Sequence, residues 1–141
     1  MMVVVDSSVI VGALHFPTQK SRDMARSAIK AAPRPLAHAL SQSYSTLTRL
    51  PVPIRISPQV AWNYLESAFP SPAIVLKAKE HHETLKLLAH EGMTGVRTYD
   101  GIIGAAARSV GAKPITSDRQ AVPVYLLVGV EFELLVPDNS A

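Results

Sequence analysis

Hydrophobic positions along the chain fall into two kinds of stretch. Short apolar runs, such as the valines at 3–5 directly before Asp6, are typical of buried strands. Longer stretches place apolar residues three and four positions apart, which is typical of amphipathic helices. The predicted strands are 3–5, 35–37, 73–76 and 114–116, with at least one more within 124–130 or 132–136, and the predicted helices are 7–14, 21–32, 38–50, a stretch opening at 57–58, 77–91 and 98–110.

The order of these elements predicts the fold class. Strands that alternate with helices of about 10 to 15 residues form βαβ units, and these build a mostly parallel sheet with helices on both faces. We therefore expect an α/β protein with three layers, α/β/α. The proline pairs at 33/35, 51/53 and 70/72 lie between periodic stretches and indicate turns. Residues 1–141 are expected to form a single domain.

Composition excludes several classes of protein. The chain is 48% apolar, but no apolar run approaches the roughly 18 residues of a membrane-spanning helix. The first residues lack the basic region of a signal peptide, so a cytoplasmic protein is expected. The absence of cysteine excludes disulfides, thiolate zinc sites and cysteine nucleophiles. The net charge of +3 is compatible with a polyanionic partner but is weak evidence alone.

Three aspartates are the candidate functional residues. Asp6 follows the first predicted strand, Asp118 follows the strand at 114–116 within two residues, and Asp100 lies in the first turn of the helix that precedes that strand. Each has an ordinary explanation as a helix cap, a dipole partner or a turn residue. Together, however, they would converge at the carboxyl ends of parallel strands, where ligands bind in such sheets.

Clustered carboxylates repel one another unless a cation neutralises them. Oxygen ligands without cysteine favour a hard ion, Mg²⁺ or Mn²⁺. A zinc site built from His81, His82 and His90 is disfavoured, because adjacent histidines point to different helix faces and the spacing from His82 to His90 is not that of a ligand pair. The small residues of 101–107 are expected to allow close helix packing. Nucleotide-cofactor motifs are missing from the sequence.

Three segments carry a resemblance to the PIN-domain family. They read VVVDSSVI at 3–10, TYDGIIGAAA at 98–107 and PITSDR at 114–119, and their order and spacing also resemble the family's. More narrowly, PLAHAL at 35–40 followed by YSTLTRLP at 44–51 looks like the third helix of VapC-type toxins from bacterial toxin–antitoxin pairs. The resemblance implies a PIN-like fold and a type II toxin that cuts RNA endonucleolytically with Mg²⁺ or Mn²⁺, by a metal-activated water.

The resemblance also assigns roles to residues. Asp6, Asp100 and Asp118 would be catalytic metal ligands, with the hydroxyls of Ser8 and Thr116 orienting them or simply capping local structure. Gln42 is a fourth catalytic position, where the family carries an acidic residue. Its neutral amide would reduce the negative charge of the site and favour one ion over two. Arg49, Arg108 and Arg119 would contact RNA phosphates unless they are ordinary solvated charges. Tyr99 could stack on a base, although a core position is the simpler expectation.

Partners and alternatives follow from the same resemblance. A cognate antitoxin protein, an RNA substrate and a homodimer are implied, with no membrane association. Gln42 keeps a second hypothesis open, a catalytically weakened PIN module that binds RNA or antitoxin with little turnover. A housekeeping nuclease of RNA maturation or decay is a third hypothesis, disfavoured by the compact chain and the toxin-like third helix.

Overall fold

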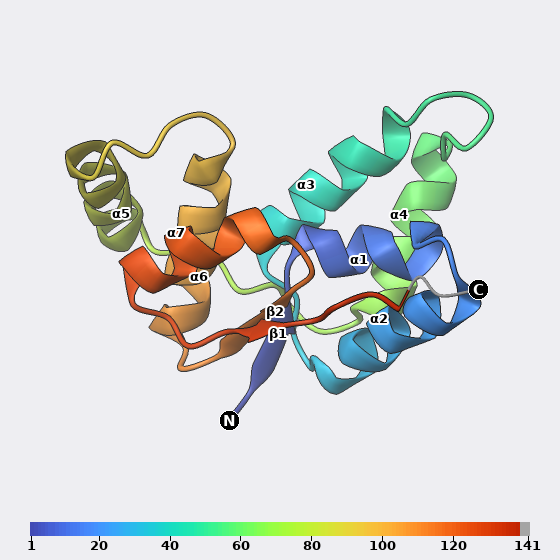
Figure 1. Ribbon diagram of the computed structural model, residues 1–141, viewed down its shortest axis with the longest axis horizontal. Coiled ribbons are helices and arrows are strands. Elements are labelled where there is room, and N and C mark those ends of the chain that lie inside the picture. Colours follow the sequence, from blue (N-terminus) through green and yellow to red (C-terminus); the bar gives the residue numbers. More distant parts are fainter. Residues whose placement is uncertain (139–141) are drawn as a thin grey trace.

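The structure, a computed structural model, describes residues 1–138, and a three-stranded parallel sheet lies at its centre (Figure 1). The strands are β1 (Val3–Val5), β2 (Lys113–Thr116) and β3 (Glu133–Leu134), in the order β1-β2-β3. Val5 pairs with Ile115, and Thr116 pairs with Leu134. The prediction of a mostly parallel sheet is confirmed, since both strand pairings are parallel.

Helices cover the sheet on both faces (Figure 1). On one side lie α1 (Ser7–His15), α2 (Gln19–Ala31), α3 (Ala37–Thr48) and α4 (Pro58–Ala68), and on the other lie α5 (Ala78–His90), α6 (Arg97–Ser109) and α7 (Val122–Val128), with the short 3₁₀ helix η1 (Arg119–Ala121) joining β2 to α7. Contacts of α1 and α2 with one face and of α6 with the other build the three-layer arrangement. The predicted α/β/α fold is thus confirmed.

Three of the predicted strand segments take other forms. The segments 35–37 and 73–76 make a single parallel bridge between Leu36 and Ile74, because the chain turns into α3 directly at Ala37. The segment 124–130 is mostly helical. Val124, Tyr125 and Val128 are buried at helical spacing while Leu126 is exposed, so its apolar run carries a helical period. A late strand was predicted within 124–130 or 132–136, and β3 lies in the second of these segments.

Small residues bring α6 and α7 together. Every residue of α6 from Gly101 to Ala107 is buried. A β-carbon on Gly104 would lie 2.8 Å from Val128 Cγ2 and 2.9 Å from Tyr125 Cδ1, which is closer than carbon atoms pack. Glycine is therefore what permits the Tyr125 ring to lie against α6, and the expectation of close helix packing is confirmed.

Within residues 1–138, every helix is too short or too polar to cross a membrane.

Candidate functional site

Two of the three aspartates lie at one edge of the sheet because their strands are parallel neighbours. Asp6 follows β1 directly, and its backbone N–H donates to the Ile115 carbonyl of β2 at 3.1 Å. Asp118 lies two residues beyond the end of β2. The strand ends therefore place both carboxylates at the carboxyl edge of the sheet, as the sequence predicts.

Asp6 is buried and held by hydrogen bonds on both carboxylate oxygens. Oδ1 accepts from the Ser8 hydroxyl and from the Ser8 backbone N–H at 3.1 Å, and Oδ2 accepts from the Tyr125 hydroxyl at 2.9 Å. Burial raises the pKa of Asp6, although hydrogen bonds from Ser8, Thr116 and Tyr125 oppose the shift. Asp6 also caps α1, so its capping role and its place at the edge coexist.

Hydroxyl groups tie the end of β1 to the end of β2. The Ser8 hydroxyl accepts from the Ser117 N–H at 2.8 Å and lies 3.3 Å from the Thr116 hydroxyl. The Thr116 hydroxyl in turn accepts from the Asp118 N–H at 3.1 Å. Ser8 and Thr116 thus lie between Asp6 and Asp118. A carboxylate fixed in this way has little freedom to rotate, which is the usual condition of a ligand held ready for a metal.

An arginine links Asp100 to Asp118. Asp100 lies in the first turn of α6, and its Oδ2 is 3.1 Å from Arg97 Nη1. The same nitrogen lies 3.7 Å from Asp118 Oδ2. Burial raises the pKa of Asp100 to about 6, with Arg97 lowering it and the charges of Asp6 and Asp118 raising it further. All three aspartates are therefore within electrostatic range of one another.

Arg97 is a site residue that the sequence analysis missed. It is the first residue of α6, where the helix dipole disfavours a cation, and an arginine placed before its aspartate is the less favourable order for a helical pair. Helix stability thus gives no reason for Arg97 at this position, whereas the two carboxylates beside it do. The sequence did contain a signal for Arg97, because an arginine three positions before an aspartate is the less favourable order on a helix. Tyr125 was also missed, and its contact with Asp6 across 119 residues had no local signal.

Gln42 lies on α3 beside the first turn of α6, since it lines the same hollow as Tyr99. Its Oε1 is buried and has no hydrogen-bond partner. Asp100 Oδ2 is likewise buried without a hydrogen bond, because its 3.1 Å approach to Arg97 is an ion pair without hydrogen-bond alignment. Two oxygens at this edge therefore lack the partner that a buried polar atom normally has.

The donor atoms at the edge fit a hard divalent cation in kind. They are carboxylate oxygens, one amide oxygen and hydroxyls, which Mg²⁺ and Mn²⁺ prefer, and two of them lack hydrogen bonds. Within residues 1–138, no three histidine, aspartate or glutamate side chains are yet close enough to hold a metal ion together. Arg97 stands between Asp100 and Asp118, so one cationic group already occupies part of that space.

The three predicted phosphate-binding arginines are not equally near the carboxylates. Arg119 follows Asp118 directly and is exposed. Arg49 is exposed at the end of α3 and lines the hollow that contains Gln42. Arg108 lies in the last turn of α6, at the opposite end from Asp100, and donates to the Val128 carbonyl. The structure thus places Arg119 next to Asp118 and Arg49 in the hollow that contains Gln42, whereas Arg108 lies away from Asp100.

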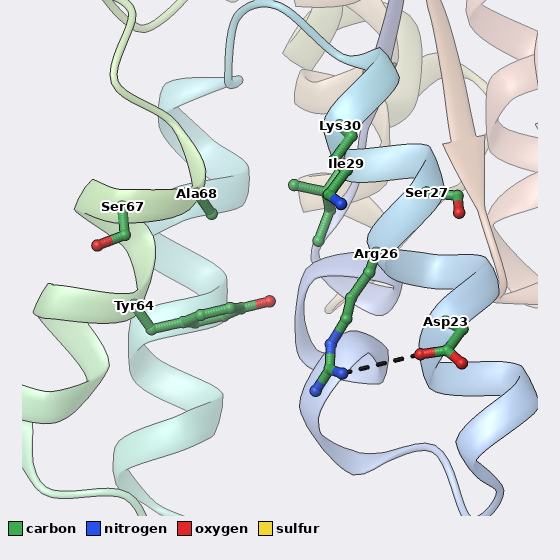
Figure 2. A pocket seen from close by; sticks show the side chains of 8 residues that line it. All are labelled: Asp23, Arg26, Ser27, Ile29, Lys30, Tyr64, Ser67 and Ala68. Atoms are coloured by element: carbon green, nitrogen blue, oxygen red, sulfur yellow. Dashed lines mark ion pairs between the residues drawn. The ribbon is translucent and has the colours of Figure 1, made fainter.

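A hollow larger than the one that contains Gln42 lies elsewhere, between α2 and α4 (Figure 2). It has a volume of about 680 Å³, with Arg26, Asp23 and Lys30 on α2 and the Tyr64 ring reaching across from α4. Tyr64 donates to the Ile10 carbonyl at 2.6 Å. The residues predicted from the sequence as catalytic do not line this hollow, so its size is no guide to the carboxylate edge.

The parallel sheet and its edge carboxylates are those expected of a PIN domain, and relatives specify the family. The chain is 36% identical to Ribonuclease VapC40 of Mycobacterium tuberculosis over 135 residues, 95% of this chain and 99% of the relative. It is 34% identical over 93 residues to Ribonuclease VapC27 of the same organism, covering 66% of this chain and 67% of the relative. The chain therefore belongs to the VapC ribonuclease family of PIN-domain proteins.

Two further comparisons bear on the fold. PAE2754 from Pyrobaculum aerophilum, a crystal structure, superposes with a TM-score of 0.58 over 88% of this chain and 84% of its own, at 17% identity, which supports the fold alone. No protein-family model matches the chain.

Proposed function

We propose that this protein is a Mg²⁺- or Mn²⁺-dependent endoribonuclease that acts as the toxin of a type II toxin–antitoxin pair. The observation that carries the proposal is the meeting of Asp6, Asp100 and Asp118 at one edge of the sheet, in a chain that belongs to the VapC ribonuclease family. Three ionised carboxylates in electrostatic range carry three negative charges, and Arg97 offsets only one of them. A divalent cation would supply the remaining positive charge.

Asp6, Asp100 and Asp118 would hold the metal. When bound, the metal supplies Lewis-acid chemistry, which activates a water for attack and offsets charge on the scissile phosphate. The hydroxyls of Ser8 and Tyr125 hold Asp6 in one orientation through their hydrogen bonds. The buried setting strengthens each electrostatic interaction that the carboxylates make.

Arg97 has a role of its own in this proposal. Its guanidinium lies beside Asp100 and Asp118 and partly neutralises them. Asp100 and Asp118 would hold the metal in place of this pairing, and a guanidinium also suits a phosphate oxygen of the substrate. Arg97 would then neutralise the carboxylates in the metal-free protein and bind the RNA in the metal-bound protein.

Gln42 sets the strength of the site. An amide oxygen ligates Mg²⁺ more weakly than a carboxylate, and the edge carries three formal negative charges where the family carries four. We therefore propose weak metal binding with one ion favoured over two. The second candidate function, a PIN module that binds RNA or antitoxin with little turnover, rests on this same residue.

The partners in this proposal are an RNA substrate, a cognate antitoxin protein and a second copy of the chain in a homodimer. The relatives supply the first of these by name, since both are called ribonucleases.

Cleavage of total RNA by the purified protein tests the function. With Mg²⁺ or Mn²⁺ the parent should produce discrete fragments, EDTA should abolish them, and Asp6→Asn should cut at least a hundredfold more slowly. Cleavage by Asp6→Asn at the parent rate would refute the assignment of the carboxylate edge.

Gln42→Glu separates the two candidate functions. If the chain is a nuclease with a weakened site, the added charge should raise cleavage at limiting Mg²⁺, and the exposed control Gln59→Glu should change nothing. A parent and a Gln42→Glu variant that both bind RNA without cutting it would favour the binding module. Induced expression should also arrest bacterial growth for the parent and not for Asp6→Asn, if the nuclease is a toxin.

A further inference from the structure

A polar groove runs along α3 toward the start of α6. Residues 38, 41, 42, 45 and 49 line it at helical spacing, so they form one face of α3, and Tyr99 of α6 closes it beside Gln42. Its volume is about 480 Å³. We refer to it as the α3–α6 groove. Because Tyr99 immediately precedes Asp100, the groove and the carboxylate edge share the first turn of α6.

An aromatic pair forms one end of the groove. The rings of Tyr99 and His38 are stacked, with centroids 5.0 Å apart and planes 28° from parallel. Tyr99 is nevertheless 42% exposed, which overturns the simpler expectation of a core tyrosine. Burial lowers the pKa of His38, and the nearby His81 lowers it further, so this ring is neutral near pH 7. A stacked, partly exposed tyrosine is a platform on which a nucleobase can lie.

Unpaired polar atoms lie on the same face of α3. Gln42 Oε1 and His38 Nε2 are buried and have no hydrogen-bond partner. Buried polar groups are rarely left in this state, and because both atoms are covered, a molecule in the groove would reach them only after these side chains rotate. A nucleobase carries donors and acceptors at the edge of its ring, so a base that stacks on Tyr99 presents hydrogen-bonding groups to its surroundings.

The charge of the groove favours a polyanion. Arg49 is exposed at its far end, and the described residues that line it include no aspartate or glutamate. Arg49, the C-cap of α3, lies seven positions after Gln42, a rise of about 10 Å. That separation suits a phosphate beyond the one being cut, so an RNA strand could reach the metal ligands and Arg49 together.

We propose that the α3–α6 groove binds a nucleotide of single-stranded RNA next to the scissile phosphate, with its base stacked on the face of Tyr99 that His38 leaves free. The inference rests on the proposed ribonuclease function and deepens it. A duplex cannot use this site, because its bases are already stacked and paired. The groove thus selects RNA segments whose bases are free.

Binding of a fluorescent single-stranded oligoribonucleotide tests the groove, measured in the Asp6→Asn background so that the RNA stays intact. Tyr99→Leu should weaken binding about tenfold, the order expected for one lost stacking contact. Tyr99→Phe should retain binding, because it keeps the ring. Tyr44→Leu is the matched control, since Tyr44 is 39% exposed on α3 but does not line the groove.

Arg49→Gln forms a second arm. It should lower the salt slope of binding by about 0.7, the value for one phosphate contact with a single strand. Arg26→Gln should leave that slope unchanged, because Arg26 lines the hollow between α2 and α4.

The outcomes distinguish the groove from the function on which it rests. Equal binding by Tyr99→Leu and Tyr44→Leu, or an equal loss with duplex RNA of the same sequence, overturns the groove even if the parent cuts RNA. Selective loss with Tyr99→Leu in a protein that never cuts RNA leaves the groove standing and overturns the nuclease. Thermal unfolding of each variant separates lost contacts from lost folding, and a loss that Tyr99→Phe shares would also contradict base stacking.

Discussion

Two helices of this protein carry an arginine and an aspartate three residues apart, with opposite consequences. On α2, Asp23 and Arg26 lie 3.8 Å apart with about half of each side chain exposed, at the hollow of Figure 2. On α6, Arg97 and Asp100 lie 3.1 Å apart and are largely buried, with Asp118 also beside the arginine. The first is an ordinary surface pair worth at most about 1 kcal/mol. The second belongs to a cluster of three carboxylates, so the neighbours and burial of a pair, and not its spacing, indicate function.

Replacing the aspartate of each pair should give the largest contrast. Asp100→Asn should reduce RNA cleavage at least a hundredfold, because the proposed metal loses a charged ligand. Asp23→Asn should stay within twofold of the parent. Initial rates on one RNA substrate at saturating Mg²⁺ measure both, and equal losses would mean that the carboxylate edge is not the active site.

Two tyrosine hydroxyls allow a second contrast between the same regions. Tyr125 donates to Asp6, whereas Tyr64, in the hollow between α2 and α4, donates to the Ile10 carbonyl. Tyr125→Phe should weaken Mg²⁺ binding and cleavage about tenfold, as loss of a group that orients a ligand typically does. Tyr64→Phe should cost stability of about 1 kcal/mol and leave Mg²⁺ affinity unchanged. Titration calorimetry and thermal unfolding of both variants check this.

The two arginines give a third contrast, in the direction of a gain. Arg97→Met should raise Mg²⁺ affinity about fivefold, because the cation beside Asp100 and Asp118 is gone, and should lower the melting temperature in EDTA. Arg26→Met should change neither quantity measurably. If Arg97→Met instead weakened Mg²⁺ binding, the arginine would support the metal site and not substitute for the metal.

The smallest expected effect is a pH dependence. Asp100 has a folded pKa of about 6, raised mainly by burial from the ordinary value of 3.8. Between these values the folded protein binds a proton that the unfolded chain releases, so stability should fall as pH rises from about 4 to about 6. Stabilisation by Mg²⁺ should grow over the same interval, since the metal displaces that proton.

Unfolding in EDTA and in Mg²⁺ from pH 4 to 7.5 measures both trends. Asp100→Asn should make both pH dependences weaker. Some dependence of stability on pH should remain, because burial raises the pKa of Asp6 as well. An unchanged slope in Asp100→Asn would mean that Asp100 ionises normally.

The sequence predicted the fold well where a short apolar run ends at a polar residue. The strand before Asp6 and the segment before Asp118 were both found, and the parallel sheet followed from the order of elements. The run at 124–130 was ambiguous because six apolar residues out of seven satisfy either period, and burial of Tyr125 against Gly104 decides for a helix. Neighbours that are distant in sequence determine such a segment.

For the candidate site, the sequence predicted the positions of the residues but not their contacts. The positions of the three aspartates at element ends followed from local patterns, and the structure places all of them at one edge. The partners of those aspartates did not follow, since Tyr125 reaches Asp6 through tertiary packing and Arg97 bridges two carboxylates from different elements. Tyr99 was expected in the core, and only its place at the exposed start of α6 corrects that.

The close packing at Gly104 links the chemistry of the sheet edge to a residue with no chemistry of its own. A β-carbon there would collide with the Tyr125 ring, so α7 would have to move outward and the Tyr125 hydroxyl would withdraw from Asp6. Substitution is therefore restricted at a buried position that carries no functional group. A descendant of this protein could retain every carboxylate and still lose its activity through one added methyl group on α6.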